Sequence, residues 1–215
     1  FKSNQKIILG GNTKDEKGNI YNTFLVFDSS GEIVHQYRKI HLVPFGEFIP
    51  FENLIAKLNL KKVTFGYQSF SSGKEREPFK LNGNKILPLI CYEIIDTGSI
   101  HFSEKDYDVV FNISEDGWFN RSIGTHQHFA HSIFRSIEEG RHIFRSTNQG
   151  LSSSISPYGQ IIYVAKANKQ SVYANDYQIL GKKTPFYVMG NTMLFFLILL
   201  GFLAQLFMKR YFKYT

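Results

Sequence analysis

Cysteine is almost absent from the sequence, because among 215 residues only Cys91 carries a thiol. An intramolecular disulfide framework is therefore excluded, and the fold must rest on a hydrophobic core. The lack of disulfides leaves the redox compartment open, since such a protein can lie on either side of a membrane. Internal repeats and low-complexity tracts are also lacking. A composition of 43% hydrophobic and 20% charged residues is typical of a globular chain.

Strong clustering of one charge is lacking as well. The net charge of +7 is a mild, scattered excess without a basic stripe, which disfavours nucleic acid as a partner. Acidic residues are missing from residue 186 onward, whereas Lys209, Arg210 and Lys213 lie close to the C-terminus. The last part of the chain therefore differs in character from the rest.

Charged residues are absent from 186–208, "FYVMGNTMLFFLILLGFLAQLFM". A helix of this length rises far enough to cross about 30 Å of hydrocarbon, so the run predicts a transmembrane helix. The basic segment 209–215 follows it, and the positive-inside rule favours a cytoplasmic C-terminus. Lys182 and Lys183 precede the run, so the charge difference between its two ends is small.

Residues 1–180 alternate between strand-like and helix-like patterns, which indicates an α/β domain with sheets covered by helices. Asn82-Gly83 is a hairpin signal that leads into the apolar strand pattern "PLICYEII", 88–95. A second hairpin is predicted within 152–166, and a short strand with a polar linker within 171–185. The other predicted strands are 6–12, 22–28, 33–39, 107–114 and 142–148, and the predicted helices are 51–60 and 125–139.

Two segments carry candidate chemistry, "YRKIHLVPFGEFIP" (37–50) and "PLICYEII". Taken alone, Cys91 reads as a small core residue, because free cysteine is among the most buried residue types. Lys39 and Glu47 taken alone read as solvated charges of a turn. In combination, an ammonium group favours a thiolate, and a carboxylate such as Glu47 or Glu93 can act as a base. Together these residues make Cys91 a candidate nucleophile.

The blocks "YRKIHLVPFGEFIPFE", "ICYEI", "NISEDGWF", "HQHFAHSIFRSIEEGRHIFRSTNQG" and "SPYGQI" resemble the nitrilase-like domain of bacterial apolipoprotein N-acyltransferases. The resemblance implies an α-β-β-α sandwich, N-terminally incomplete, followed by one C-terminal transmembrane helix. On this basis residues 1–180 are the nitrilase-like domain, 181–185 a linker, 186–208 the membrane helix and 209–215 a basic cytoplasmic tail.

The resemblance also implies a reaction and a set of site residues. Cys91 matches the nucleophile that takes an acyl chain from a phospholipid as a thioester and passes it to the amino group of a diacylglyceryl-apolipoprotein. Lys39 matches the lysine that stabilises the thiolate and the oxyanion, and Glu47 a supporting acid. Tyr92 and Glu93 match positions that shape the nucleophile's surroundings. No cofactor is implied, and the implied location is the bacterial inner membrane with the nitrilase-like domain on the periplasmic side.

The sequence departs from this family at several points. The general-base glutamate of the family precedes the segment that matches, and so do its N-terminal membrane helices, so we expect the chain to be the C-terminal part of such an enzyme. Glu115 and Gly117 stand where the family usually has Asn and Ala. Two alternatives stay open: a non-catalytic remnant that keeps the fold, and an amidase-type hydrolase of a small C–N bond.

Histidines gather in "HQHFAH", where His126, His128 and His131 could suggest a metal site. On a helix only His128 and His131 share a face, and no cysteine or carboxylate completes the set of ligands that zinc requires. We therefore expect no metal site here.

Overall fold

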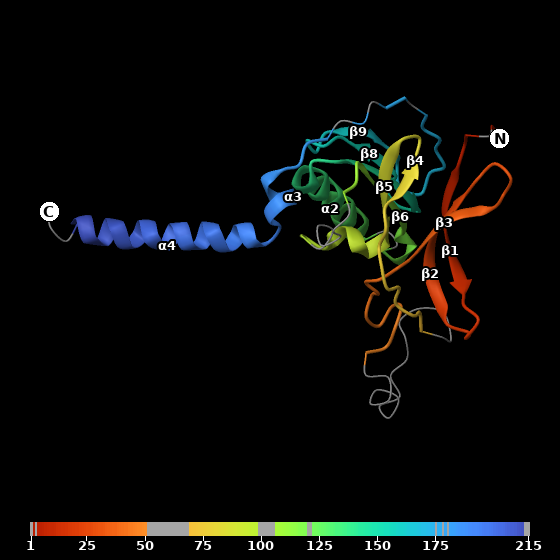
Figure 1. The fold of residues 1–215 in the computed structure, drawn as a ribbon, viewed down its shortest axis with the longest axis horizontal. Helices are drawn as coiled ribbons and strands as arrows, with labels where there is room; N and C mark the ends of the chain where they lie inside the picture. Colours follow the sequence, from red (N-terminus) through yellow and green to blue (C-terminus); the bar gives the residue numbers. More distant parts are fainter. Residues whose placement is uncertain are drawn as a thin grey trace.

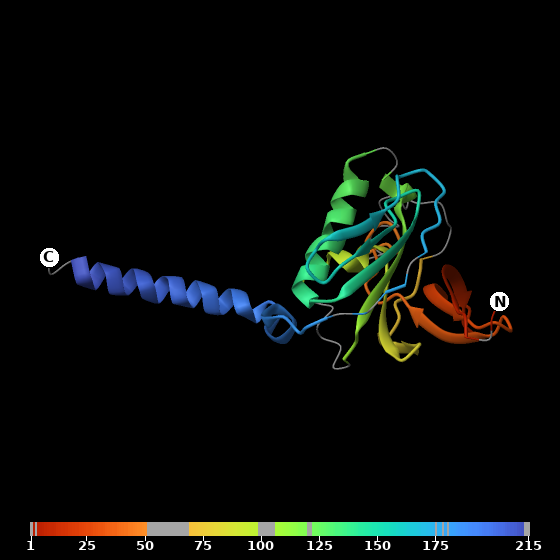
Figure 2. The same ribbon diagram turned by 90° about the horizontal axis from the view of Figure 1, so that it is seen from above.

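The computed structural model describes residues 2, 4–50, 69–98, 106–119, 122–174, 176, 177, 179 and 181–212. Within them a three-stranded sheet and a six-stranded sheet pack face to face, and one long helix covers the other side of the larger sheet (Figures 1 and 2). This arrangement confirms the predicted α/β class. The predicted helix 51–60 lies outside the described residues.

The smaller sheet is an antiparallel meander of β1 (Ile7–Lys14), β2 (Ile20–Phe27) and β3 (Ile33–Arg38). Its central strand β2 has a neighbour on each edge, and the side chains of Phe24 and Val26 are buried against the larger sheet. β3 ends at Arg38, so the next residue, Lys39, leaves the sheet at that edge.

The larger sheet has the order β4-β5-β6-β7-β8-β9. Its three central strands, β5, β6 and β7, run parallel, whereas β4, β8 and β9 pair antiparallel with their neighbours. The strands are β4 (Phe79–Leu81), β5 (Asn84–Ile90), β6 (Val109–Glu115), β7 (His142–Asn148), β8 (Ser153–Ile155) and β9 (Ile161–Val164). Both predicted hairpins are confirmed.

The first of these hairpins turns at Asn82 and Gly83, which adopt φ angles of 49° and 83°. Two positive φ angles are the requirement of the tight turn that Asn-Gly favours, because glycine has no Cβ to clash and asparagine tolerates this conformation. The turn sends the chain into β5, and the parallel strands β5 and β6 then end at the same edge of the sheet.

Two apolar cores lie on the two faces of the larger sheet. On one face the helix α2 (Gly124–Glu139) contributes Phe129, which packs with Leu87, Leu89 and Ile143. On the other face Phe24, Val26 and Tyr37 of the smaller sheet pack with Ile86, Ile90 and Val109. The central strands are therefore buried on both sides, which explains their continuous apolar sequences.

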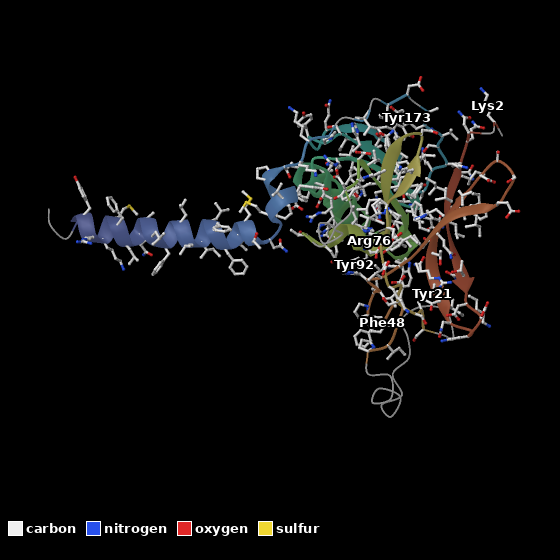
Figure 3. The ribbon with its side chains drawn as sticks, viewed as in Figure 1. Lys2, Tyr21, Phe48, Arg76, Tyr92 and Tyr173 are labelled. Atoms are coloured by element: carbon white, nitrogen blue, oxygen red, sulfur yellow. The ribbon has the colours of Figure 1, made fainter. Side chains whose placement is uncertain are left out.

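The C-terminal apolar run is interrupted rather than forming one helix. α3 (Pro185–Met189) ends at Gly190, whose φ of 54° suits glycine, and α4 (Thr192–Phe212) follows. α4 projects from the domain with its side chains on all sides (Figure 3). It is the one helix among the described residues that is long and apolar enough to cross a membrane. None of the residues in its most apolar stretch is buried.

Two local predictions were wrong. Residues 91–95 do not continue the strand of 88–90 but form a 3-10 helix, η2 (Cys91–Ile95), because Glu93 folds back to accept a hydrogen bond from the backbone of Ile90. The described residues of 171–185 contain no strand, since no neighbouring strand pairs with them.

Candidate active site

Cys91 lies at the sharp turn where β5 ends and η2 begins. Its φ of 50° places a non-glycine residue in the left-handed region, which a β-carbon disfavours. The thiol is partly exposed and unpaired, so it is not the sealed core cysteine that its sequence context alone would favour. This position, at the carboxyl end of a parallel strand, is where α/β sheets place their ligand sites.

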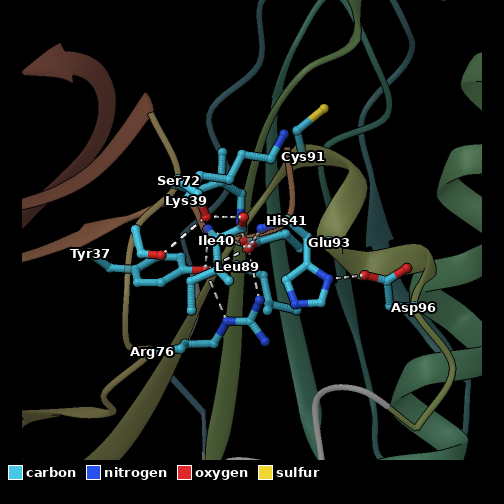
Figure 4. A network of polar contacts seen from close by, with 12 residues as sticks. Tyr37, Lys39, Ile40, His41, Ser72, Arg76, Leu89, Cys91, Glu93 and Asp96 are labelled. Atoms are coloured by element: carbon cyan, nitrogen blue, oxygen red, sulfur yellow. Dashed lines mark hydrogen bonds and ion pairs between the residues drawn. The ribbon is translucent and has the colours of Figure 1, made fainter. Parts of the chain in front are cut away.

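Lys39 and Glu47 form an ion pair at the end of β3. The Lys39 Nζ atom lies 2.7 Å from Oε2 of Glu47, and both side chains are almost fully buried. The carboxylate also accepts hydrogen bonds from the Asn22 side chain and from the backbone of Val43, each at 2.8 Å. In Figure 4 the Lys39 side chain points toward Cys91. The solvated-turn reading of these two charges is therefore wrong.

Glu93 joins the segment that carries Lys39 to the segment that carries Cys91. Its Oε1 atom accepts hydrogen bonds from the Tyr37 hydroxyl at 2.5 Å and from the Arg76 guanidinium at 2.8 Å. The same oxygen lies within 3.3 Å of the backbone nitrogens of Ile40 and His41. Its other oxygen accepts a hydrogen bond from the backbone nitrogen of Ile90, the residue before Cys91. A carboxylate engaged in this way positions its neighbours and is poorly suited to serve as a base.

Arg76 and the side chain of Tyr37 were assigned no role from the sequence, and Arg76 lies in the highly charged stretch "KEREP", 74–78. Burial and the adjacent Glu93 carboxylate raise the pKa of Tyr37 above its usual range. Burial opposes the charge of Arg76, but Glu93 outweighs it and raises the pKa of the guanidinium. Both groups therefore keep their protons and donate to Glu93.

The outer side of the site is more open. Tyr92 is 43% exposed, and its ring centroid lies 6.2 Å from that of His128. Trp118 is 51% exposed as well. Glu115, the unusual acid of "NISEDGWF", accepts hydrogen bonds from the Gly117 backbone and the Asn148 side chain, which bridge the ends of β6 and β7. Its charge therefore caps local backbone and leaves the Lys39–Glu47 pair intact.

Metal-ligating side chains do not converge on this site: in the described parts of the chain no group of three or more His, Cys, Asp and Glu residues could hold an ion. The His128 side chain instead lies against the turn at Cys91, where its Nε2 atom is 3.2 Å from the carbonyl oxygen of Cys91.

Comparison with known proteins places this geometry in a family. The family described as carbon-nitrogen hydrolase matches residues 2–178. The chain belongs to the carbon-nitrogen hydrolase family. Two solved structures show the same fold. A carbon-nitrogen hydrolase from Helicobacter pylori G27 matches with a TM-score of 0.59 and 15% identity, over 78% of this chain and 60% of that chain. The glutamine-dependent NAD+ synthetase from Acinetobacter baumannii matches with a TM-score of 0.59 and 20% identity, over 78% of this chain and 30% of that chain.

Within the carbon-nitrogen hydrolase family, the chain is similar to curated proteins named apolipoprotein N-acyltransferase. It is 38% identical to that of Agrobacterium fabrum over 143 residues, which cover 66% of this chain and 27% of the relative. It is 34% identical to that of Brucella suis over 163 residues, which cover 73% of this chain and 31% of the relative. The chain thus spans about a third of the length of these relatives or less.

Proposed function

We propose that the chain is the C-terminal part of an apolipoprotein N-acyltransferase in which Cys91 is the acyl-carrying nucleophile. The observation that carries the proposal is the buried Lys39–Glu47 ion pair directed at a strained, partly exposed cysteine. The similarity to apolipoprotein N-acyltransferases supports acyl transfer over hydrolysis of a small amide.

The reaction has two steps. The Cys91 thiolate attacks the ester carbonyl of a phospholipid, a C–S bond forms, and the ester oxygen leaves with a proton as the lysophospholipid. The α-amino group of a diacylglyceryl-cysteine then attacks the thioester, an amide forms, and the thiol is regenerated. Division into two acyl transfers lowers each barrier. The Lys39 ammonium stabilises the thiolate and the oxyanion of each tetrahedral intermediate.

Glu47 supports this chemistry by holding Lys39, and Glu93 holds the backbone directly before Cys91. Tyr92, the residue after Cys91, lies on the exposed side of the site. We infer that the general base is a glutamate supplied by the N-terminal part of the enzyme, so that turnover depends on that part.

The proposed location is the bacterial inner membrane. Residues 1–180 form the carbon-nitrogen hydrolase domain on the periplasmic side, 181–185 link it to the apolar run 186–208, and the basic tail 209–215 is cytoplasmic. α4 supports this assignment because its large apolar side chains are exposed along the helix. A membrane anchor suits two substrates that are themselves lipids.

The test is a fusion of this chain to the N-terminal region of the Agrobacterium fabrum relative, reconstituted in vesicles that contain phospholipid with a labelled acyl chain. We expect label on the protein that hydroxylamine removes, because thioesters react with it, and none on the Cys91→Ala variant. Equal labelling of Cys91→Ala would overturn the nucleophile assignment. A folded fusion protein that acquires no label would favour a non-catalytic remnant. Release of ammonia from small amides would favour an amidase.

A further inference from the structure

We propose that a buried polar network of Asn112, Asp116, His128 and Arg145 positions the nucleophile. The network holds the carbonyl oxygen of Cys91 through hydrogen bonds. This inference deepens the proposed function, because it concerns the same cysteine, but its test does not require turnover. None of the four is a residue to which sequence reasoning assigned a role in the site.

The backbone at Cys91 adopts an unfavourable conformation. A β-carbon makes the left-handed φ of 50° unfavourable, so the surrounding structure has to hold it. The backbone of β5 pairs with β4 and β6, but the carbonyl of Cys91 lies beyond the last strand residue, Ile90. Holding this carbonyl therefore fixes the peptide plane after Cys91, and with it the turn from which the thiol projects.

Two side chains from different elements donate to that carbonyl. His128, on α2, places Nε2 at 3.2 Å from the oxygen, and Asn112, on β6, places Nδ2 at 3.4 Å. Both donors are buried, with exposed fractions of 3% and 0%. The nucleophile turn is thus fastened to the helix on one side and to the neighbouring strand on the other.

The orientation of both donors is determined by Arg145. It donates to the Oδ1 atom of Asn112, which leaves the amide Nδ2 to face Cys91. It also lies 3.0 Å from Nδ1 of His128, and Nε2 of that ring faces a carbonyl that can only accept. Because a carbonyl oxygen can only accept, Nε2 is the nitrogen that donates to Cys91.

Asp116 completes the network by balancing the charge. Its two oxygens lie 2.9 and 2.8 Å from the same Arg145 nitrogen, its Oδ1 lies 3.0 Å from Nδ1 of His128, and the Ser114 hydroxyl donates to it at 2.6 Å. Burial alone would raise the pKa of Asp116, but these donors lower it to about 2. Several contacts to one buried ion pair restrict the motion of its side chains, and a positioning group needs restricted motion.

The test measures the alkylation of Cys91 by iodoacetamide in the full chain in detergent micelles. Because Cys91 is the single cysteine, the rate constant reports on this thiol alone. We expect His128→Ala and Asn112→Ala to slow alkylation near neutral pH by about tenfold and to move the rate–pH profile to higher pH, since the relaxed thiol leaves the Lys39 ammonium. His128→Gln, which keeps a donor, should recover part of the rate.

The matched control is His131→Ala, one turn further along the same helix. It should leave the alkylation rate within about twofold of the parent, because the rate depends on the local environment of the thiol. The melting temperature of each variant separates positioning from folding. If His128→Ala does not fold, His128→Gln and Asn112→Ala decide. Folded variants that alkylate at the parent rate, with an unchanged pH profile, would overturn the inference.

The proposed function can fail separately. If no acyl label reaches Cys91 in the vesicle assay but the variants change alkylation as expected, the network positions the thiol and the acyl-transfer assignment is wrong. If acyl label is found on Cys91 but the variants leave alkylation unaffected, the acyl-transfer assignment stands and the network does not position the thiol.

Discussion

The Arg76 guanidinium donates to the Glu93 carboxylate at 2.8 Å across a site where the two side chains are 7% and 0% exposed. This pair connects the chain after the smaller sheet to the turn that holds Cys91, two residues away from Glu93. Because the donors come from several segments, Glu93 acts as the point at which the Lys39 and Cys91 segments are aligned.

Glu93→Gln is expected to lower the free energy of unfolding by about 3–5 kcal/mol, because it leaves a buried guanidinium without its counter-charge. Urea unfolding followed by fluorescence measures the change. Glu32→Gln, at an exposed position, is the matched control and should stay within about 0.5 kcal/mol of the parent. If Glu93→Gln is as stable as Glu32→Gln, the pair does not anchor the site.

Lys39→Met is expected to cost about 3–5 kcal/mol of stability for the same reason, since the Glu47 carboxylate stays buried without a cation. It should also slow alkylation of Cys91, because the thiolate loses its positive neighbour. The measurement is the iodoacetamide rate constant beside a urea titration. Lys80→Met, on the exposed side of β4, should change neither quantity. An unchanged alkylation rate in folded Lys39→Met would separate Lys39 from the thiol.

Acid should weaken the polar network of Asn112, Asp116, His128 and Arg145 within a defined pH range. The pKa of Asp116 is depressed to about 2 in the folded protein from an ordinary value of 3.8, so its contribution is fully present above the ordinary value and is lost as the pH falls through about 2. The contribution is on the order of 2 kcal/mol.

Urea unfolding of the parent and of Asp116→Asn from about pH 6 to about pH 2 should show a stability difference that shrinks with falling pH. Asp15, whose pKa is also about 2, contributes to the parent's acid response but is common to both proteins, so the difference isolates Asp116. A difference independent of pH would contradict the prediction.

Tyr187 is expected to hold α3 against the domain. Its hydroxyl donates to Asp106 at 3.0 Å, its ring lies under the Arg141 guanidinium at 4.9 Å, and the residue is 8% exposed. Tyr187→Ala should destabilise the protein by about 3–5 kcal/mol, in the range of other large aromatic truncations. Tyr187→Phe keeps the ring and should cost about 1 kcal/mol.

Trypsin cleavage after Lys182 or Lys183 measures this docking. We expect faster cleavage in Tyr187→Ala than in Tyr187→Phe, because α3 is released only when the ring is lost. Equal cleavage rates in the two variants would show that the ring contacts do not hold α3.

Much of the fold could be predicted because its signals are local. The apolar pattern of 107–114 became β6, the helical spacing of 125–139 became α2 within one residue of its start, and Asn82-Gly83 formed the expected turn. The run 186–208 is mostly helical, but its first turn is separate, because Gly190 allows a bend that apolar composition does not report.

The strand prediction for 88–95 failed because a side chain decided the outcome. Cys91-Tyr92-Glu93 has the alternation of a strand, but the Glu93 carboxylate turns back to the Ile90 backbone and closes η2. Periodicity describes which faces are apolar, and it contains no information about a hydrogen bond that a backbone N–H donates to a side chain three residues later.

By itself the sequence determined the α/β class, the strand that delivers Cys91 and the apolar C-terminal helix, since each depends on neighbours along the chain. The family resemblance pointed to Cys91, Lys39 and Glu47 as a set. Only the tertiary structure brought Glu93 to Tyr37, 56 positions earlier, and His128 to the Cys91 carbonyl, 37 positions earlier. Such contacts join elements through the packing of two sheets and a helix, and no local pattern of polarity specifies which buried polar groups will meet.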